Sequence, residues 1–150
     1  YEMYSRDWSS DVCSSDLTPP VLAMAALEAS LDIWDRVDMG EVRARSLALG
    51  DLLIAEIARR CPSLRLVTPP AHAQRGSQVS FAFAGGYAAM QALIARGVIG
   101  DFRAPDIMRF GITPLYIGEA EVLKAAEIIE EVINGEVWRR QEYQVVNAVT

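Results

Sequence analysis

The sequence predicts an α+β fold, in which a small mixed sheet is covered by helices on one side. Long segments near both ends repeat apolar residues at helical spacing, whereas shorter segments between them alternate apolar and polar residues as strands do. The chain has 150 residues, of which 51% are hydrophobic. This composition is sufficient for one compact domain with one core.

Residues 1–17 differ from the rest of the chain. They repeat Ser-Ser-Asp at residues 9–11 and 14–16 and have no sustained helical or strand period. Polar segments without periodicity are typical of loops or disorder. We therefore expect a disordered or foreign segment over residues 1–17, followed by a domain over residues 18–150.

Two helices are predicted at the start of this domain. Thr18 can cap the first, over residues 20–37, because its hydroxyl accepts a backbone N–H and prolines suit a first helical turn. Asp38 can cap the second, over residues 40–60, which Cys61-Pro62 ends. The two helices need a partner surface to cover their apolar sides.

Two strands and a third helix follow. The strands are predicted over residues 65–68 and 78–83, the second with apolar residues at alternate positions. Gly85-Gly86 could cradle a phosphate, but without a phosphate-binding fingerprint the pair indicates an ordinary turn. The helix over residues 87–96 ends at Gly97, since glycine is common just past a helix end.

Another pair of strands and a last helix complete the prediction. Residues 98–103 and 106–112 form strands joined at Ala104-Pro105. The last helix is marked by apolar residues at helical spacing between Val122 and Ile133, and Asn134-Gly135 closes it.

The strand over residues 106–112 carries the candidate site. Its alternation places Met108, Phe110 and Ile112 on a core face and Arg109 with Gly111 on the opposite face. A fixed guanidinium beside a missing side chain leaves room for an anion to approach. From the local pattern alone, a solvated arginine on an edge strand is an equally open interpretation.

Charge and composition argue against several classes of partner. The net charge is −6 and the pI is about 4.8, whereas nucleic acids and anionic membranes attract clustered positive charge. Arg59-Arg60 and Arg139-Arg140 lie near segment ends, where basic pairs favour the helix dipole or stay solvated. With no long apolar run and no signal-peptide order, we expect a cytoplasmic protein that binds neither nucleic acid nor membrane.

The residues most often used in catalysis are few. Cys13 and Cys61 have no metal-ligand spacing, and His72, the single histidine, lies in a proline-rich loop segment. Lys124 is the single lysine and lies three residues from both Glu121 and Glu127, as in a solvated ion pair. A metal site or a hydrolytic triad is therefore not expected.

The amino-acid sequence of the chain resembles that of a known family. The stretch from Ala95 to Arg103, followed by that from Ile107 to Tyr116, is similar to the C-terminal small domain of bacterial kynureninases. Further matching stretches occur in the family's order: Thr18 to Leu22, Asp32 to Asp35, Arg75 to Ser80, and the tail from Trp138 to Thr150. Residues 1–17 depart from the family pattern, with Leu17 where the family usually has a glycine.

The resemblance implies a fold and an activity. Kynureninases are pyridoxal-phosphate enzymes of the aspartate-aminotransferase fold type that act in tryptophan catabolism and are commonly homodimers. They hydrolyse L-kynurenine to anthranilate and L-alanine, or 3-hydroxykynurenine to 3-hydroxyanthranilate. The chain would be the small domain plus the entry helix of such a subunit, with an amino acid as its substrate. Its preference between the two substrates stays open.

The resemblance also implies roles for particular residues. Arg109 occupies the position of the family's carboxylate-binding arginine, and Thr18 matches the residue that reaches the cofactor, commonly across the dimer interface. Arg103 competes with Arg109 for the substrate role, or pairs with Asp101 or Asp106. The family's Schiff-base lysine has no counterpart here, so the 150-residue chain is expected to be inactive by itself.

Two alternatives stay open at this point. The chain could be the small domain of another fold-type-I pyridoxal enzyme, such as a cysteine desulfurase or an aminotransferase. It could also be a binding or dimerisation module without chemistry. Thr113-Pro114-Leu115-Tyr116 after the arginine strand, together with Thr18-Pro19-Pro20, favours the kynureninase hypothesis.

Overall fold

The computed structural model describes residues 20–145. The chain divides into two compact units, Tyr1–Asp38 and Met39–Thr150, and each is described by itself. Thr18 and the predicted boundary between residues 17 and 18 lie outside the described residues.

The first unit contains a shorter helix than predicted. Helix α2 spans Val21–Leu31 with Pro20 at its N-cap, and a 3₁₀ helix, η1, spans Trp34–Arg36. The expectation of one helix over residues 20–37 is therefore wrong. No residue of α2 is buried, so packing does not extend the helix through Asp32 and Ile33, whose helix propensities are modest.

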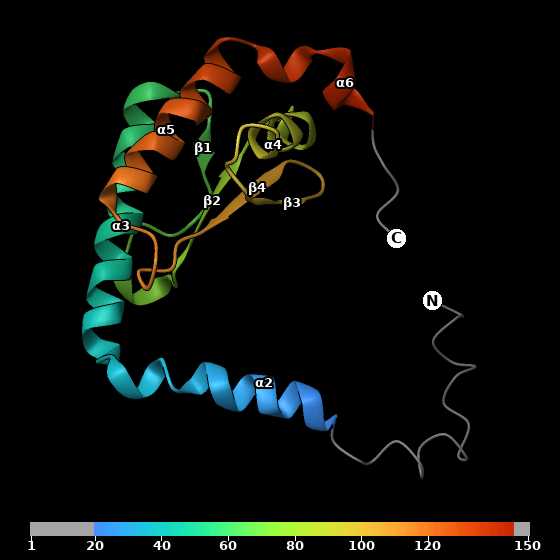
Figure 1. Ribbon diagram of the computed structural model, residues 1–150. Coiled ribbons are helices and arrows are strands. Elements are labelled where there is room, and N and C mark those ends of the chain that lie inside the picture. Colours follow the sequence, from blue (N-terminus) through green and yellow to red (C-terminus); the bar gives the residue numbers. More distant parts are fainter. Residues whose placement is uncertain (1–19, 146–150) are drawn as a thin grey trace, which may run out of the picture. The chain divides into compact units, whose positions relative to one another are not determined.

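The second unit confirms the predicted α+β fold (Figure 1). Its elements in chain order are α3 (Met39–Arg60), β1 (Arg65–Leu66), η2 (His72–Gln74), β2 (Gln78–Ala82), α4 (Gly86–Ile94), β3 (Asp101–Arg103), β4 (Ile107–Gly111), α5 (Glu119–Asn134), η3 (Val137–Arg139) and α6 (Gln141–Gln144). The 3₁₀ helix η3 and the short helix α6 were not predicted.

The sheet has the strand order β1-β2-β4-β3. All three pairings within the described residues are antiparallel, so the expectation of a mixed sheet is wrong in this respect. The connection between β3 and β4 is too short for the crossover that a parallel pair requires. Chain reversal at this connection therefore makes the β3–β4 pair antiparallel.

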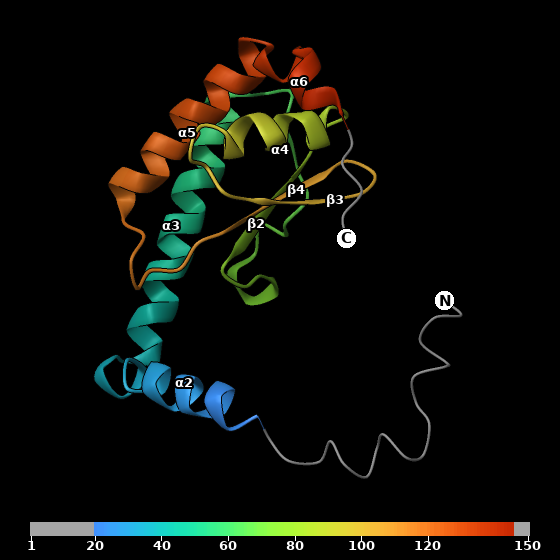
Figure 2. The ribbon, with the colours of Figure 1, turned by 45° about the vertical axis from the view of Figure 1, so that its right-hand side comes forward.

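The core lies between one face of the sheet and the helices α3, α4 and α5. Phe81 of β2 and Met108 of β4 are almost fully buried, as are Ile57 of α3 and Ile129 of α5. Figure 2 shows α4 running along the sheet while α3 and α5 pack against each other beside it. These helices thus cover one face of the sheet, and Ser80 and Arg109 lie on the opposite face, where Ser80 is buried and Arg109 is partly exposed.

Helix α4 ends at Ile94, two residues before the predicted end, and a turn continues the chain to Gly97. Gly97 has a φ of +85°, and the N–H of Val98 donates to the carbonyl of Leu93 at 3.0 Å. This left-handed conformation is easily adopted by glycine and ends the helix sharply. Among residues 20–145, no helix has both the length and the apolar character that crossing a membrane requires.

Candidate functional site

Arg109 lies on the face of the sheet opposite the helices α3, α4 and α5. The alternation along β4 buries Met108 and Phe110 in the core and turns Arg109 the other way, as predicted. Its side chain is 30% exposed. The guanidinium is therefore partly held by the protein and partly accessible.

Asp101 is the main partner of Arg109. The two residues stand directly opposite each other in the β3–β4 register, so their side chains share one face. Nη2 of Arg109 donates a hydrogen bond to Oδ2 of Asp101. This bond, helped by the nearby positive charge of Arg103, holds the pKa of Asp101 below its ordinary value.

Arg103 joins the same carboxylate. Its Nε lies 3.3 Å from Oδ2 of Asp101, and its side chain is 65% exposed. The two pairings considered for Arg103 are thereby decided in favour of Asp101 over Asp106. One carboxylate bridges two guanidinium groups, which we call the Arg–Asp–Arg cluster (Arg103, Asp101, Arg109).

The other neighbour of Arg109 in the sheet is Ser80 of β2. Ser80 is buried, and its backbone N–H donates to Oγ1 of Thr68 at 2.8 Å, while Nε2 of Gln78 donates to its hydroxyl at 3.1 Å. These bonds anchor the strand beside Arg109. The guanidinium of Arg109 therefore lies next to a hydrogen-bonded, buried serine on the same sheet face.

Two glycines shape the surroundings of Arg109. A Cβ on Gly100 would lie 2.8 Å from the backbone oxygen of Arg109 and 2.7 Å from Cε of Met90, so only glycine permits this close approach. A Cβ on Gly111 would meet nothing within 4 Å. The space beside Arg109 expected from the sequence at Gly111 is open.

Lys124 and His72 each pair with a carboxylate outside the Arg–Asp–Arg cluster. Nζ of Lys124 lies 3.2 Å from Oε2 of Glu127, and its side chain is 70% exposed, which matches the predicted ion pair. His72 is not a simply solvated loop residue, because its Nε2 lies 2.8 Å from Oδ2 of Asp51. Neither residue belongs to the Arg–Asp–Arg cluster.

Cys61 is a buried free cysteine, and burial raises the pKa of its thiol to about 11. A thiol of such high pKa is a poor nucleophile at neutral pH. The other cysteine, Cys13, lies outside the described residues. Among residues 20–145, no group of histidine, cysteine, aspartate and glutamate side chains could hold a metal ion.

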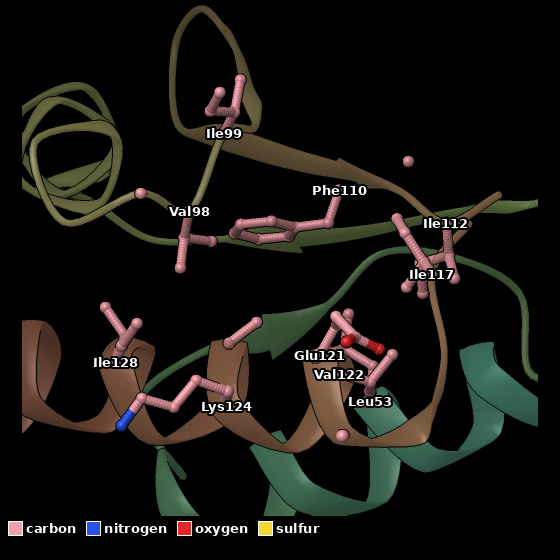
Figure 3. Close-up of a pocket in the computed structure, with 14 residues that line it drawn as sticks. Leu53, Val98, Ile99, Phe110, Ile112, Ile117, Glu121, Val122, Lys124 and Ile128 are labelled. Atoms are coloured by element: carbon pink, nitrogen blue, oxygen red, sulfur yellow. The ribbon is translucent and has the colours of Figure 1, made fainter.

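A cavity of about 420 Å³ opens between β4 and α5, on the helical side of the sheet (Figure 3). Apolar side chains form much of its wall, among them Val98, Phe110 and Ile117. Arg109 is not among its lining residues. The cavity reaches Gly111 of β4 but does not include the side chain of Arg109.

Sequence reasoning missed the bond between Asp101 and Arg109. A signal was present, since pairing the two predicted strands as a hairpin around Ala104-Pro105 places these positions opposite each other. It also missed the pairs Arg59 and Arg60 with Glu56, and Arg60 with Glu130. Arg59 and Arg60 therefore form ion pairs, whereas the sequence analysis expected them to favour the helix dipole or to stay solvated.

The described residues define a class by their fold: a small α+β domain with a partly exposed arginine on the sheet face opposite its helices. The family model of the kynureninase C-terminal domain matches residues 42–129. The chain belongs to the kynureninase family, an enzyme family, which confirms the resemblance seen in the sequence.

Curated relatives agree with this assignment. Kynureninases of Burkholderia mallei (strain SAVP1), Burkholderia pseudomallei (strain K96243) and Pseudomonas fluorescens are each 48% identical to the chain over 135 residues. Each match covers 89% of the chain and 32% of the relative. The chain therefore spans about a third of the length of these relatives.

Proposed function

We propose that the chain is the C-terminal part of a kynureninase, a pyridoxal-phosphate-dependent hydrolase. The reaction is cleavage of L-kynurenine to anthranilate and L-alanine, or of its 3-hydroxy form to 3-hydroxyanthranilate and L-alanine. Membership of the family supports this proposal, and it favours kynureninase over the small domain of a cysteine desulfurase or an aminotransferase. The chain contributes the substrate-binding side of the site.

Arg109 binds the α-carboxylate of the substrate. The observation that carries this role is a partly exposed guanidinium on the sheet face opposite the helices, with open space at Gly111. An arginine fork matches the two oxygens of a carboxylate and so orients the substrate as well as attracting it. The role of Arg109 is therefore both affinity and alignment.

The chain offers no lysine suited to covalent attachment of the cofactor. Pyridoxal phosphate requires a lysine for covalent attachment, and Lys124, the single lysine in the sequence, is an exposed residue of α5 paired with Glu127. The attachment lysine would lie in the part of the longer relatives that the match does not cover. The 150-residue chain alone is expected to be inactive.

Further parts of the proposal rest on the resemblance. The full-length protein is a cytoplasmic homodimer, residues 18–150 form its small domain, and Thr18 contributes to the cofactor site. Thr18 is a short hydrogen-bonding residue beside two prolines.

The test uses a chimera in which the chain replaces the matching region of the Pseudomonas fluorescens kynureninase. In this enzyme we expect Arg109→Ala to raise KM for L-kynurenine and to lower kcat, because charge and orientation are both lost. One charge-assisted hydrogen bond is worth about 1.5–3 kcal/mol, so kcat/KM should fall roughly 10-fold to 150-fold.

Arg59→Ala is the matched control, since it removes an exposed arginine that pairs with Glu56 on α3. Its steady-state constants should stay within about twofold of the parent chimera. An active chimera in which Arg109→Ala leaves both kcat and KM unchanged contradicts the proposal.

A further inference from the structure

We infer that Asp101 is a positioning residue for Arg109: it holds the guanidinium on the sheet face opposite the helices with donors left over for a carboxylate. This inference rests on the proposed function of Arg109. The contact is built into the sheet, because Asp101 and Arg109 are direct partners in the β3–β4 register. It is also fixed by the close backbone approach that Gly100 permits.

The hydrogen-bond donors of Arg109 are divided in a way that suits a ligand. A guanidinium has five N–H groups. Asp101 accepts one from Nη2, and the Nε–H is buried without a partner. The three N–H groups that remain are on the terminal nitrogens, and no other partner for Arg109 occurs among residues 20–145. Terminal N–H groups can bind both oxygens of one carboxylate.

Asp101 also sets the charge of the site. The Arg–Asp–Arg cluster combines two guanidinium groups and one carboxylate, so its net charge is one positive unit. This matches one α-carboxylate. The bond from Arg109 is the first cause that holds the pKa of Asp101 below its ordinary value, so the carboxylate stays ionised to a lower pH than a free aspartate does.

Asp101 has more cationic partners than an ordinary surface acid. It is 48% exposed, yet its Oδ2 atom is shared by two arginines, whereas Glu127, at 52% exposure, meets only Lys124. Removal of Asp101 leaves Arg103 and Arg109 on adjacent strands of one face, where like charges repel. The guanidinium of Arg109 then loses its fixed direction.

A double-mutant cycle in the chimeric holoenzyme tests the inference. We expect Asp101→Ala to raise KM for L-kynurenine about tenfold, with a smaller loss in kcat. Asp101→Asn should recover part of this loss, since its amide oxygen still accepts from Nη2 but carries no negative charge. In the double variant, Asp101→Ala should change KM by less than about twofold relative to Arg109→Ala alone, because Asp101 acts through Arg109.

Glu127→Ala is the control and should leave KM unchanged. The inference is wrong, and the proposed function stands, if the effects of Asp101→Ala and Arg109→Ala on KM multiply in the double variant. The same holds if Asp101→Ala leaves KM unchanged while Arg109→Ala raises it. If Arg109→Ala does not change KM, the proposed function fails instead.

A second measurement does not require turnover or the other part of the enzyme. In the ¹⁵N-labelled 150-residue chain, the Nε–H signal of Arg109 is identified by its loss in Arg109→Lys. We expect Asp101→Ala to accelerate hydrogen exchange of this signal and Glu127→Ala to leave its exchange unchanged, because only Asp101 restrains the guanidinium. Unchanged exchange in Asp101→Ala overturns the inference even where a variant has lost activity.

Discussion

At the scale of single residues, Asp51 of α3 holds the segment that leads into β2. Its Oδ1 atom accepts from the almost fully buried guanidinium of Arg75, and its Oδ2 atom lies 2.8 Å from Nε2 of His72. Arg43 adds two bonds from Nη2, to the carbonyl oxygens of His72 and Arg75, at 2.7 Å each. These bonds fix the approach to the strand that flanks Arg109.

Asp51→Asn tests whether the bond between Asp51 and Arg75 contributes stability that depends on pH. The hydrogen bond from Arg75 lowers the pKa of Asp51 below its ordinary value of 3.8, although the side chain is half exposed. A depressed pKa in the folded state contributes stability above the unfolded pKa, and this stability is lost as the pH falls through the folded value. We expect Asp51→Asn to cost about 1 kcal/mol at pH 7 in urea unfolding.

The difference between Asp51→Asn and the parent chain should shrink as the pH falls below 3.8. Glu127→Gln, which removes the charge from an exposed pair with Lys124, should cost no more than a few tenths of a kcal/mol at either pH. A loss for Asp51→Asn that is the same at pH 7 and at about pH 3 contradicts an ionic tether.

At the scale of elements, the connection from α4 to β3 brings Asp101 against Arg109. Gly97 ends α4 in a left-handed conformation, and Gly100 then passes so close to β4 that a side chain would overlap the backbone oxygen of Arg109. The short strand β3 can therefore pair with β4 at this register. Two glycines in this loop thus serve the site without touching a ligand.

Gly100→Ala should destabilise the chain, because the new Cβ would meet a backbone atom at 2.8 Å as well as the flexible end of Met90. Overpacking of this kind costs about 1–3 kcal/mol, measured as a lower unfolding midpoint in urea or heat. Gly76→Ala is the matched control, since its Cβ would meet nothing within 4 Å. Equal midpoints for the two variants would show that the close approach is not needed.

At the scale of the whole molecule, the first unit carries an apolar helix that its own described residues do not bury. Helix α2 has no buried residue, and Val21, Leu22, Met24 and Leu27 are all more than half exposed. Apolar surface of this extent is typical of an interface or of an aggregation-prone region. The relatives are about three times longer than the matched region, so sequence that could cover α2 exists in them.

Leu22→Glu should reduce self-association of the isolated 150-residue chain, because Leu22 is 88% exposed and apolar contact drives association. Light scattering against protein concentration measures the effect. Gln141→Glu adds the same charge at an exposed residue of α6 and serves as the control. If both variants reduce scattering equally, net charge and not the apolar surface of α2 is responsible.

Local pattern was sufficient to predict much of this protein. Period-two alternation assigned Met108 and Arg109 to opposite faces of one strand, and helical spacing located α3 and α5, because both signals depend on neighbouring residues. The motifs around Arg109 were also sufficient to indicate the family. These properties are local in the chain, so they can be found without coordinates.

Only the tertiary structure decided which distant residues meet. The antiparallel strand order, the Asp101 bond to Arg109 and the attachment of Arg75 to Asp51 each join positions separated by a turn or by whole elements. Such contacts depend on turn geometry, strand register and the packing of helices, which no short window of sequence contains. For the same reason helix α2 ended earlier than its pattern suggested, since packing that would extend it is absent from the described residues.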